Sequence, residues 1–204
     1  MSVEKKQQDT LIDVIRHGEP VGGRRFRGSG IDDPLSESGW SQMNATIGDA
    51  SPWHRVITSP LQRCRHFAEA LGNKLNIPVT TENNLREVGF GGWEGKSPEF
   101  LKATDPAGYT AFYQDPVNCR PEGAEPLADF AGRVIVTLDN MLDHYSGEHL
   151  LVVAHAGVVR AVLGHALGLE PVVWYRTQVS NAGITRLRFT PDQVRLEFHN
   201  RLSL

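Results

Sequence analysis

Apolar residues along the chain form two kinds of pattern: short continuous runs and longer segments of helical period. The runs at 11–15, 56–58 and 150–154 are typical of buried strands. The segments 61–75 and 127–145 place apolar residues on one face and therefore predict amphipathic helices. Because strands alternate with helices, the sequence predicts a three-layer α/β fold, with a mostly parallel sheet and helices on both faces.

Polar residues and prolines mark the ends of further helices. Ser36 is a candidate N-cap for a helix that opens over 36–43. Ser59 is a candidate N-cap for the next helix, with Pro60 in its first turn. A last helix is predicted over 158–167.

The remaining segments outside the helices are shorter or less regular. Residues 20–34 are rich in Gly and Arg and have no period, which indicates a loop. Residues 78–82 are expected to be extended. The segments 184–189 and 194–198 alternate apolar with polar residues, which predicts a pair of edge strands.

The segment 97–126 is predicted to form a small helical cap over the body. Its helical patches are interrupted by Pro106 and Gly108. The chain, residues 1–204, is expected to be one domain, because domains usually run to roughly 100–200 residues. Residues 1–10 form a polar leader ahead of that domain.

Composition excludes several classes of protein. The 204 residues carry 21 Lys+Arg against 24 Asp+Glu, and 40% are hydrophobic, so the chain is neither disordered nor collagen-like. A net charge of −3 argues against a nucleic-acid partner. The polar leader lacks the apolar core of a signal peptide, and no apolar run approaches the ~20 residues of a membrane span. We therefore expect a cytoplasmic protein with no membrane partner. The sequence leaves the oligomeric state open.

Cysteine and histidine usage gives no metal or disulfide signal. Cys64 and Cys119 are too far apart for a CxxC motif, and buried reduced thiols are expected. Six histidines lie on predicted helices or polar surfaces without metal-ligand spacing, and a structural role is expected for all of them: His54, His66, His144, His149, His165 and His199.

Charge is unevenly distributed. Residues 16–30 carry a local net charge of +3, which leaves −6 for the rest of the chain. The charged residues of this segment are Arg16, Glu19, Arg24, Arg25 and Arg27. A small phosphate ester drawn to one focused site suits this asymmetry.

Two histidines follow predicted strands. His17 stands beside Arg16 and before Gly18, which would let a ligand approach the backbone closely. His155 follows the run 150–154 in the same way. Ligands of such sheets bind outside the carboxyl ends of the strands, so both histidines could meet in one pocket. Taken singly, each could equally be a structural histidine.

Two further segments could carry chemistry. Arg63 is predicted in the first turn of a helix, near free N–H groups that favour anions, although most such arginines are merely exposed. Glu87 and Glu94 lie among glycines near Phe90 and Trp93. A carboxyl that aromatic side chains shield from water holds its proton more readily, as a general acid must. The alternative is a glycine-rich turn whose aromatic residues only pack against the core.

Together these segments form an ordered set of motifs. RHGE begins at Arg16, SPLQR at Ser59, LREVGFGGWEG at Leu85 and VVAHAG at Val152. Over about residues 11–188 the set resembles the histidine phosphatase superfamily, the phosphoglycerate-mutase-like proteins.

The resemblance implies a set of roles. His17 would be the nucleophile that becomes a phosphohistidine, and Arg16, Arg63 and His155 would surround the phosphate. Glu87 would be the acid/base. No metal or cofactor is implied, because Arg and His neutralise the phosphoryl oxygens.

Less central positions complete the substrate contacts. The backbone N–H of Ala156 and the side chain of Asn181 would lie near the phosphate. Relatives often carry an Asn shortly after RHGE, where this chain reads Val21-Gly22-Gly23. Gly N–H groups or the side chains of Arg24 and Arg27 could replace that contact.

The resemblance implies a phosphomonoesterase acting on a small phosphorylated substrate. In style the chain is most similar to α-ribazole-5′-phosphate phosphatases of cobalamin assembly. The alternatives are a phosphoglycerate mutase, a sugar or nucleotide phosphatase, and a non-catalytic phosphate-binding module. The short cap and the missing Asn favour a phosphatase over a mutase.

Overall fold

A single six-stranded sheet runs through the computed structural model, which describes residues 9–204. Its strand order is β3-β2-β4-β1-β5-β6, with β1 to β4 parallel and β5 and β6 antiparallel. The strands are β1 (Thr10–Arg16), β2 (Arg55–Thr58), β3 (Val79–Thr81), β4 (His149–Ala154), β5 (Ile184–Phe189) and β6 (Val194–Arg201). The predicted leader, residues 1–10, lies mostly outside the described residues.

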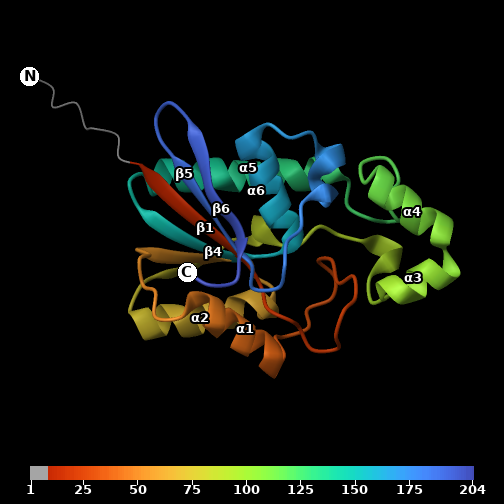
Figure 1. The fold of residues 1–204 in the computed structure, drawn as a ribbon, viewed down its shortest axis with the longest axis horizontal. Helices are drawn as coiled ribbons and strands as arrows, with labels where there is room; N and C mark the ends of the chain where they lie inside the picture. Colours follow the sequence, from red (N-terminus) through yellow and green to blue (C-terminus); the bar gives the residue numbers. More distant parts are fainter. Residues whose placement is uncertain (1–8) are drawn as a thin grey trace, which may run out of the picture.

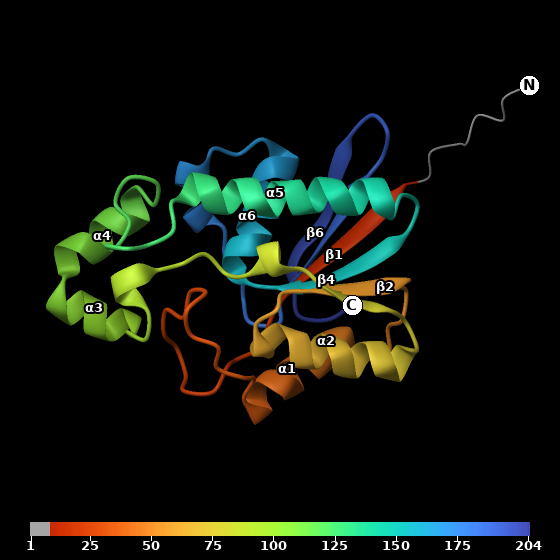
Figure 2. The same cartoon turned by 180° about the vertical axis from the view of Figure 1, so that it is seen from behind.

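Helices cover both faces of the sheet, which confirms the predicted layers (Figure 1). On one face lie α1 (Glu37–Ile47) and α2 (Gln62–Leu75). On the other lie α5 (Leu127–His144) and α6 (Ala156–Leu167), as the reverse view also shows (Figure 2). Each face has its own apolar core: Phe130 and Val152 belong to the α5/α6 side, and Phe67 and Val153 to the α1/α2 side.

The predicted cap projects beyond one end of the sheet (Figures 1 and 2). It contains α3 (Pro98–Thr104) and α4 (Pro106–Gln114). Pro106 marks the predicted break between two helices, but Gly108 lies inside α4 and does not interrupt it. Pro106 opens α4, and the N–H of Gly108 donates to the side chain of Asp105, which caps it. Three 3-10 turns complete the fold: η1 (Asn83–Leu85), η2 (Gly91–Trp93) and η3 (Pro171–Arg176).

Two predicted helix starts need correction. Ser36 caps α1 as expected, because its Oγ accepts the N–H of Gly39 at 3.0 Å. Ser59 does not cap α2, which begins later, at Gln62. The N–H of Gln62 instead donates to Asp32 at 2.6 Å, so the cap comes from a residue 30 positions earlier. Likewise α6 begins at Ala156 rather than at residue 158.

The prediction that 184–189 and 194–198 are both edge strands is wrong for the first. β5 lies between β1 and β6, and only β6 is at the edge of the sheet. The alternation in β5 reflects one-sided burial, which a strand next to the edge also experiences. Its backbone is paired on both sides.

A buried carboxylate, Asp13, lies in the middle of β1. It accepts hydrogen bonds from Trp53, His149 and two nitrogens of Arg186, at 2.7–3.0 Å. Burial alone would raise the pKa of Asp13, but these donors outweigh burial and hold the pKa below its ordinary value of 3.8. His149 is therefore structural, but it is buried rather than on a helix or polar surface as predicted.

The two cysteines differ in exposure. Cys64 is buried, as expected, and burial raises the pKa of its thiol. Cys119 is exposed, contrary to the prediction, because it follows α4 on the outside of the cap.

Candidate active site

Three neighbouring strands deliver three polar residues to one edge of the sheet. β2, β4 and β1 end at Thr58, Ala154 and Arg16: Arg16 pairs with Ala154, and Thr58 pairs one residue earlier, with Val153. The residues that follow are Ser59, His155 and His17. Backbone hydrogen bonds fix this edge, since the N–H of His17 donates to Ala154 at 2.9 Å. The rings of His17 and His155 lie 5.2 Å apart, so the two histidines do meet, although only His17 lines the cavity.

His17 presents an unprotonated nitrogen to the cavity. Its Nδ1 lies 2.7 Å from the carbonyl oxygen of Gly18, which can only accept, so Nδ1 carries the proton and Nε2 has the lone pair. The side chain is only 6% exposed. Burial and the charges of Arg63 and Arg16 hold the pKa of His17 well below 6.5. His17 is therefore neutral near pH 7, as a nucleophile must be.

Gly18 is required for a different reason from the one predicted. A Cβ at this position would collide with the backbone carbonyl of Gly39 in α1. The glycine thus allows a helix, rather than a ligand, to approach the chain beside His17.

Arg16 and Arg63 are held by backbone carbonyls. Arg16 donates to Val179 at 2.7 Å, and Arg63 donates to Ile31 and Gly28 at 2.8 and 2.9 Å. The Nε atoms of both arginines are buried and, within residues 9–204, have no hydrogen-bond partner. Burial lowers the pKa of Arg16 to about 10, so it stays charged at neutral pH. Two oriented guanidinium groups with free donors suit a tetrahedral oxyanion.

His155 packs edge-on against the ring of His17 and is not among the residues that line the cavity. It is fully buried, and its Nε2 is 2.7 Å from the hydroxyl of Ser59. Burial, Arg63 and His17 lower the pKa of His155 well below 6.5. Ser59 therefore positions His155, a role that the sequence did not suggest. Direct contact between His155 and a phosphate stays a prediction.

Glu87 sits at the amino end of α6. Its carboxylate accepts the N–H of Gly157 at 3.1 Å and that of Val88 at 2.9 Å. A Cβ at position 157 would collide with this carboxylate, so Gly157 makes the close approach possible. Glu87 is 9% exposed and lines the same cavity as His17, next to Phe90 and Ala156.

The two loop arginines predicted as substrate ligands, Arg24 and Arg27, differ in their contacts. Arg24 is exposed and lines the cavity. Arg27 also lines it, but its guanidinium bonds Asp33 at 2.9 Å and the carbonyls of Val21 and Gly23. Arg27 therefore holds the loop together. Asn181, a predicted ligand, is not among the residues that line the cavity.

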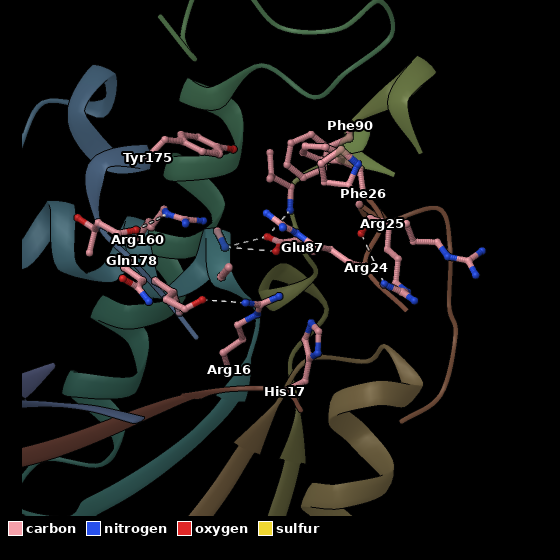
Figure 3. Close-up of a pocket in the computed structure, with 18 of the residues that line it drawn as sticks. Arg16, His17, Arg24, Arg25, Phe26, Glu87, Phe90, Arg160, Tyr175 and Gln178 are labelled. Atoms are coloured by element: carbon pink, nitrogen blue, oxygen red, sulfur yellow. Dashed lines mark hydrogen bonds between the residues drawn. The ribbon is translucent and has the colours of Figure 1, made fainter. Parts of the chain in front are cut away.

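The cavity measures about 390 Å³, within the range of small-molecule sites (Figure 3). Several of its lining residues were not foreseen: Phe26, Arg160, Tyr175 and residues 176–179. One feature of the sequence could have indicated that Arg160 faces the site. Arg160 lies four residues after Ala156, so the two residues share a face of a helix that contains both.

Residues 9–204 lack two features that would indicate a membrane or a metal. No helix in this part of the chain combines the length and apolarity needed to cross a bilayer. Over the same residues, no group of three or more His, Cys, Asp or Glu side chains is arranged to hold a metal ion.

Known proteins resemble this chain over most of its length. It is 30% identical over 187 residues to the bifunctional protein Rv2228c of Mycobacterium tuberculosis, covering 90% of this chain and 51% of the relative. It is 31% identical over 167 residues to the adenosylcobalamin/alpha-ribazole phosphatase of Salmonella typhimurium, covering 79% and 82% of the two chains. The chain thus spans about half the length of the first of these relatives.

Solved structures share the fold. The mycobacterial glucosyl-3-phosphoglycerate phosphatase complexed with VO3 superimposes with a TM-score of 0.82 at 26% identity, covering 93% of this chain and 98% of that one. A family model described as the histidine phosphatase superfamily (branch 1) matches residues 12–202. With His17, Arg16, Arg63 and Glu87 gathered around one cavity, the chain belongs to the histidine phosphatase superfamily.

Proposed function

We propose that the protein is a phosphomonoesterase that hydrolyses a small phosphate ester through a phosphohistidine. The observation that carries this proposal is the neutral His17, whose Nε2 faces a cavity walled by Arg16, Arg63 and Glu87. A nucleophile, two cationic groups and a carboxyl are the parts that phosphoryl transfer without a metal requires.

The reaction proceeds in two displacements. Nε2 of His17 attacks phosphorus as the bond from phosphorus to the ester oxygen breaks, and the Glu87 carboxyl gives its proton to the departing alcohol. The Glu87 carboxylate then takes a proton from water, whose oxygen attacks phosphorus. The P–N bond breaks, orthophosphate leaves, and His17 returns to its neutral form.

The arginines stabilise the charge on the transferring group. Arg16 and Arg63 are already oriented by backbone carbonyls, so little reorganisation is needed when the phosphoryl oxygens arrive. The ring of His155 packs against that of His17, and the hydroxyl of Ser59 holds His155 through a hydrogen bond to its Nε2.

Two kinds of substrate have support. α-Ribazole 5′-phosphate, which would place the protein in cobalamin biosynthesis, is supported by the Salmonella relative and by the aromatic lining residues Phe26, Phe90, Tyr113 and Tyr175. An ester with a further acidic group is supported by the glucosyl-3-phosphoglycerate phosphatase and by the arginines of the cavity.

Trapping of the intermediate tests the mechanism. The protein is mixed with a ³²P-labelled ester and quenched in alkali, where phosphohistidine survives. Label is expected on His17 and none on the His17→Ala variant, with His144→Ala as a control because His144 is exposed on α5. Full activity of His17→Ala would refute the mechanism. Conversion of 3- to 2-phosphoglycerate without phosphate release would indicate a mutase, and phosphate binding without hydrolysis a binding module.

A further inference from the structure

The cavity carries more positive charge than one phosphate group requires. One carboxylate, Glu87, lines it among the described residues, against seven arginines: Arg16, Arg24, Arg25, Arg27, Arg63, Arg160 and Arg176. A phosphomonoester brings about two negative charges. Asp33 neutralises Arg27, yet several guanidinium groups remain. Partly buried like charges repel one another more strongly than fully hydrated ones, so this surplus favours a ligand with further negative charge.

Arg160 is the best placed of the additional arginines. Arg24 and Arg176 are exposed, so solvent screens them. Arg160 is partly buried, and its Nε donates to the carbonyl of Thr177 at 3.1 Å. Its guanidinium also lies over the ring of Tyr175, 5.0 Å from the centroid. These contacts fix the side chain with its end directed into the cavity (Figure 3).

Arg160 lies near the phosphoryl pocket but outside it. It follows Ala156 by one helical turn on α6, a rise of about 6 Å along the axis. The charge of Arg160 helps to lower the pKa of Arg16, which places the two guanidinium groups within electrostatic reach. An anion bound between them or beside them would relieve this repulsion.

We propose that Arg160 binds a second anionic oxygen group, a carboxylate or a phosphate, on the alcohol part of the substrate. This proposal rests on the phosphomonoesterase function and names its substrate class: short phosphate esters whose alcohol is itself acidic. The single helical turn between Ala156 and Arg160 keeps the second group within a few bonds of the ester oxygen. α-Ribazole 5′-phosphate has no such group and is expected to be the poorer substrate.

Three short esters that carry groups of different charge near the ester oxygen test this subsite. 3-Phosphoglycerate, glycerol 3-phosphate and O-phosphoethanolamine carry an anionic, a neutral and a cationic group at comparable positions. We expect kcat/KM to fall in that order, with at least about a tenfold difference between the first two. Equal kcat/KM values for 3-phosphoglycerate and glycerol 3-phosphate would overturn the proposal.

Variants assign the preference to Arg160. Arg160→Gln is expected to lower kcat/KM for 3-phosphoglycerate at least fivefold more than for glycerol 3-phosphate, mainly through KM, and Arg160→Lys is expected to restore part of the preference. Arg195→Gln removes the same charge from exposed β6, at the far end of the sheet, and should leave the ratio unchanged. Equal losses on both esters in Arg160→Gln and Arg160→Lys would show a structural role and refute the subsite.

Measurements of binding affinity distinguish a failure of the Arg160 subsite from a failure of the proposed phosphomonoesterase function. Calorimetric titration of the wild-type protein and Arg160→Gln with 3-phosphoglycerate and glycerol 3-phosphate needs no turnover. If no ester is hydrolysed, the phosphomonoesterase proposal fails, and a binding preference that depends on Arg160 would still support the subsite. Equal affinities for the two esters in the wild-type protein would refute the subsite whatever the activity.

Discussion

Two buried polar clusters are centred four residues apart, on Asp13 within β1 and on His17 just after it, and they differ in how far their hydrogen bonds are satisfied. Around Asp13, every donor is directed at the carboxylate, and the pKa of the group falls below its ordinary value. Around His17, two arginine Nε atoms are buried without partners, and the pKa values of Arg16 and His17 are lowered by burial and by neighbouring positive charge.

The difference separates a structural role from a binding role. A buried charge with a full set of partners stabilises the fold it occupies, whereas buried donors without partners cost free energy until a ligand accepts them. Both clusters contain Arg and His side chains that are buried or partly buried, so residue type alone does not distinguish them. The following predictions test the distinction.

The largest effect is expected from His17→Ala. Loss of the nucleophile should lower kcat by a factor on the order of 10⁴ or more. The free energy of unfolding should change little or rise, because the substitution removes a desolvated ring that faces two arginines. Steady-state kinetics and urea unfolding of the same preparation measure both, and a large loss of stability would contradict the distinction between the clusters.

Glu87→Gln should follow, with a loss of about 10²–10⁴ in kcat. The amide oxygen can still accept the N–H of Gly157, so the local structure should persist. The loss should be smaller for an ester with a good leaving group, such as p-nitrophenyl phosphate, since that alcohol needs no proton. An equal loss on all esters would argue against general acid catalysis.

Asp13→Asn should show the opposite behaviour to His17→Ala. Removal of this charge leaves Arg186 and His149 with an incomplete partner, and the expected cost is about 3 kcal/mol of unfolding free energy. Urea unfolding measures the cost, while kcat of the folded fraction should stay within about twofold. A large fall in kcat at unchanged stability would give Asp13 a functional role.

Orthophosphate should stabilise the protein through the unsatisfied cluster. At a concentration of about 100 times Kd, binding to the folded state alone adds about 2.7 kcal/mol. Asp13→Asn should keep this gain, whereas Arg16→Gln should lose most of it. Thermal unfolding with and without phosphate, at constant ionic strength, provides the comparison.

The smallest effect is a two-step dependence of stability on pH. The folded-state pKa values of His17 and His155 lie below 6.5, so the unfolded chain binds protons first and stability falls as pH drops below 6.5. The pKa of Asp13 is also lowered, so its contribution is lost as pH falls below about 3.8 and through the folded-state pKa. Each group contributes at most about 1.4 kcal/mol per pH unit. His17→Ala should weaken the first step and Asp13→Asn the second.

The sequence predicted the layers, the cap and the meeting of His17 with His155, because each depends on local periodicity and on chain order. It could not predict the partner of Ser59, which lies 96 residues away, or the replacement of its capping role by Asp32. Arg160 was missed because its position depends on where α6 begins. The Asp13 cluster brings together side chains from β1, β4, β5 and a loop, and no pattern along the chain encodes that assembly.

The hydrogen bond by which Asp32 caps the start of α2 has a consequence for engineering. Asp32 belongs to the same loop that supplies the carbonyls of Gly28 and Ile31 to Arg63. The segment 20–35 is therefore both a wall of the substrate cavity and a support for the helix that carries a phosphate-binding arginine. A graft of this loop from a relative would change selectivity only if it arrived with its own capping residue, so loop and helix must be exchanged as one module.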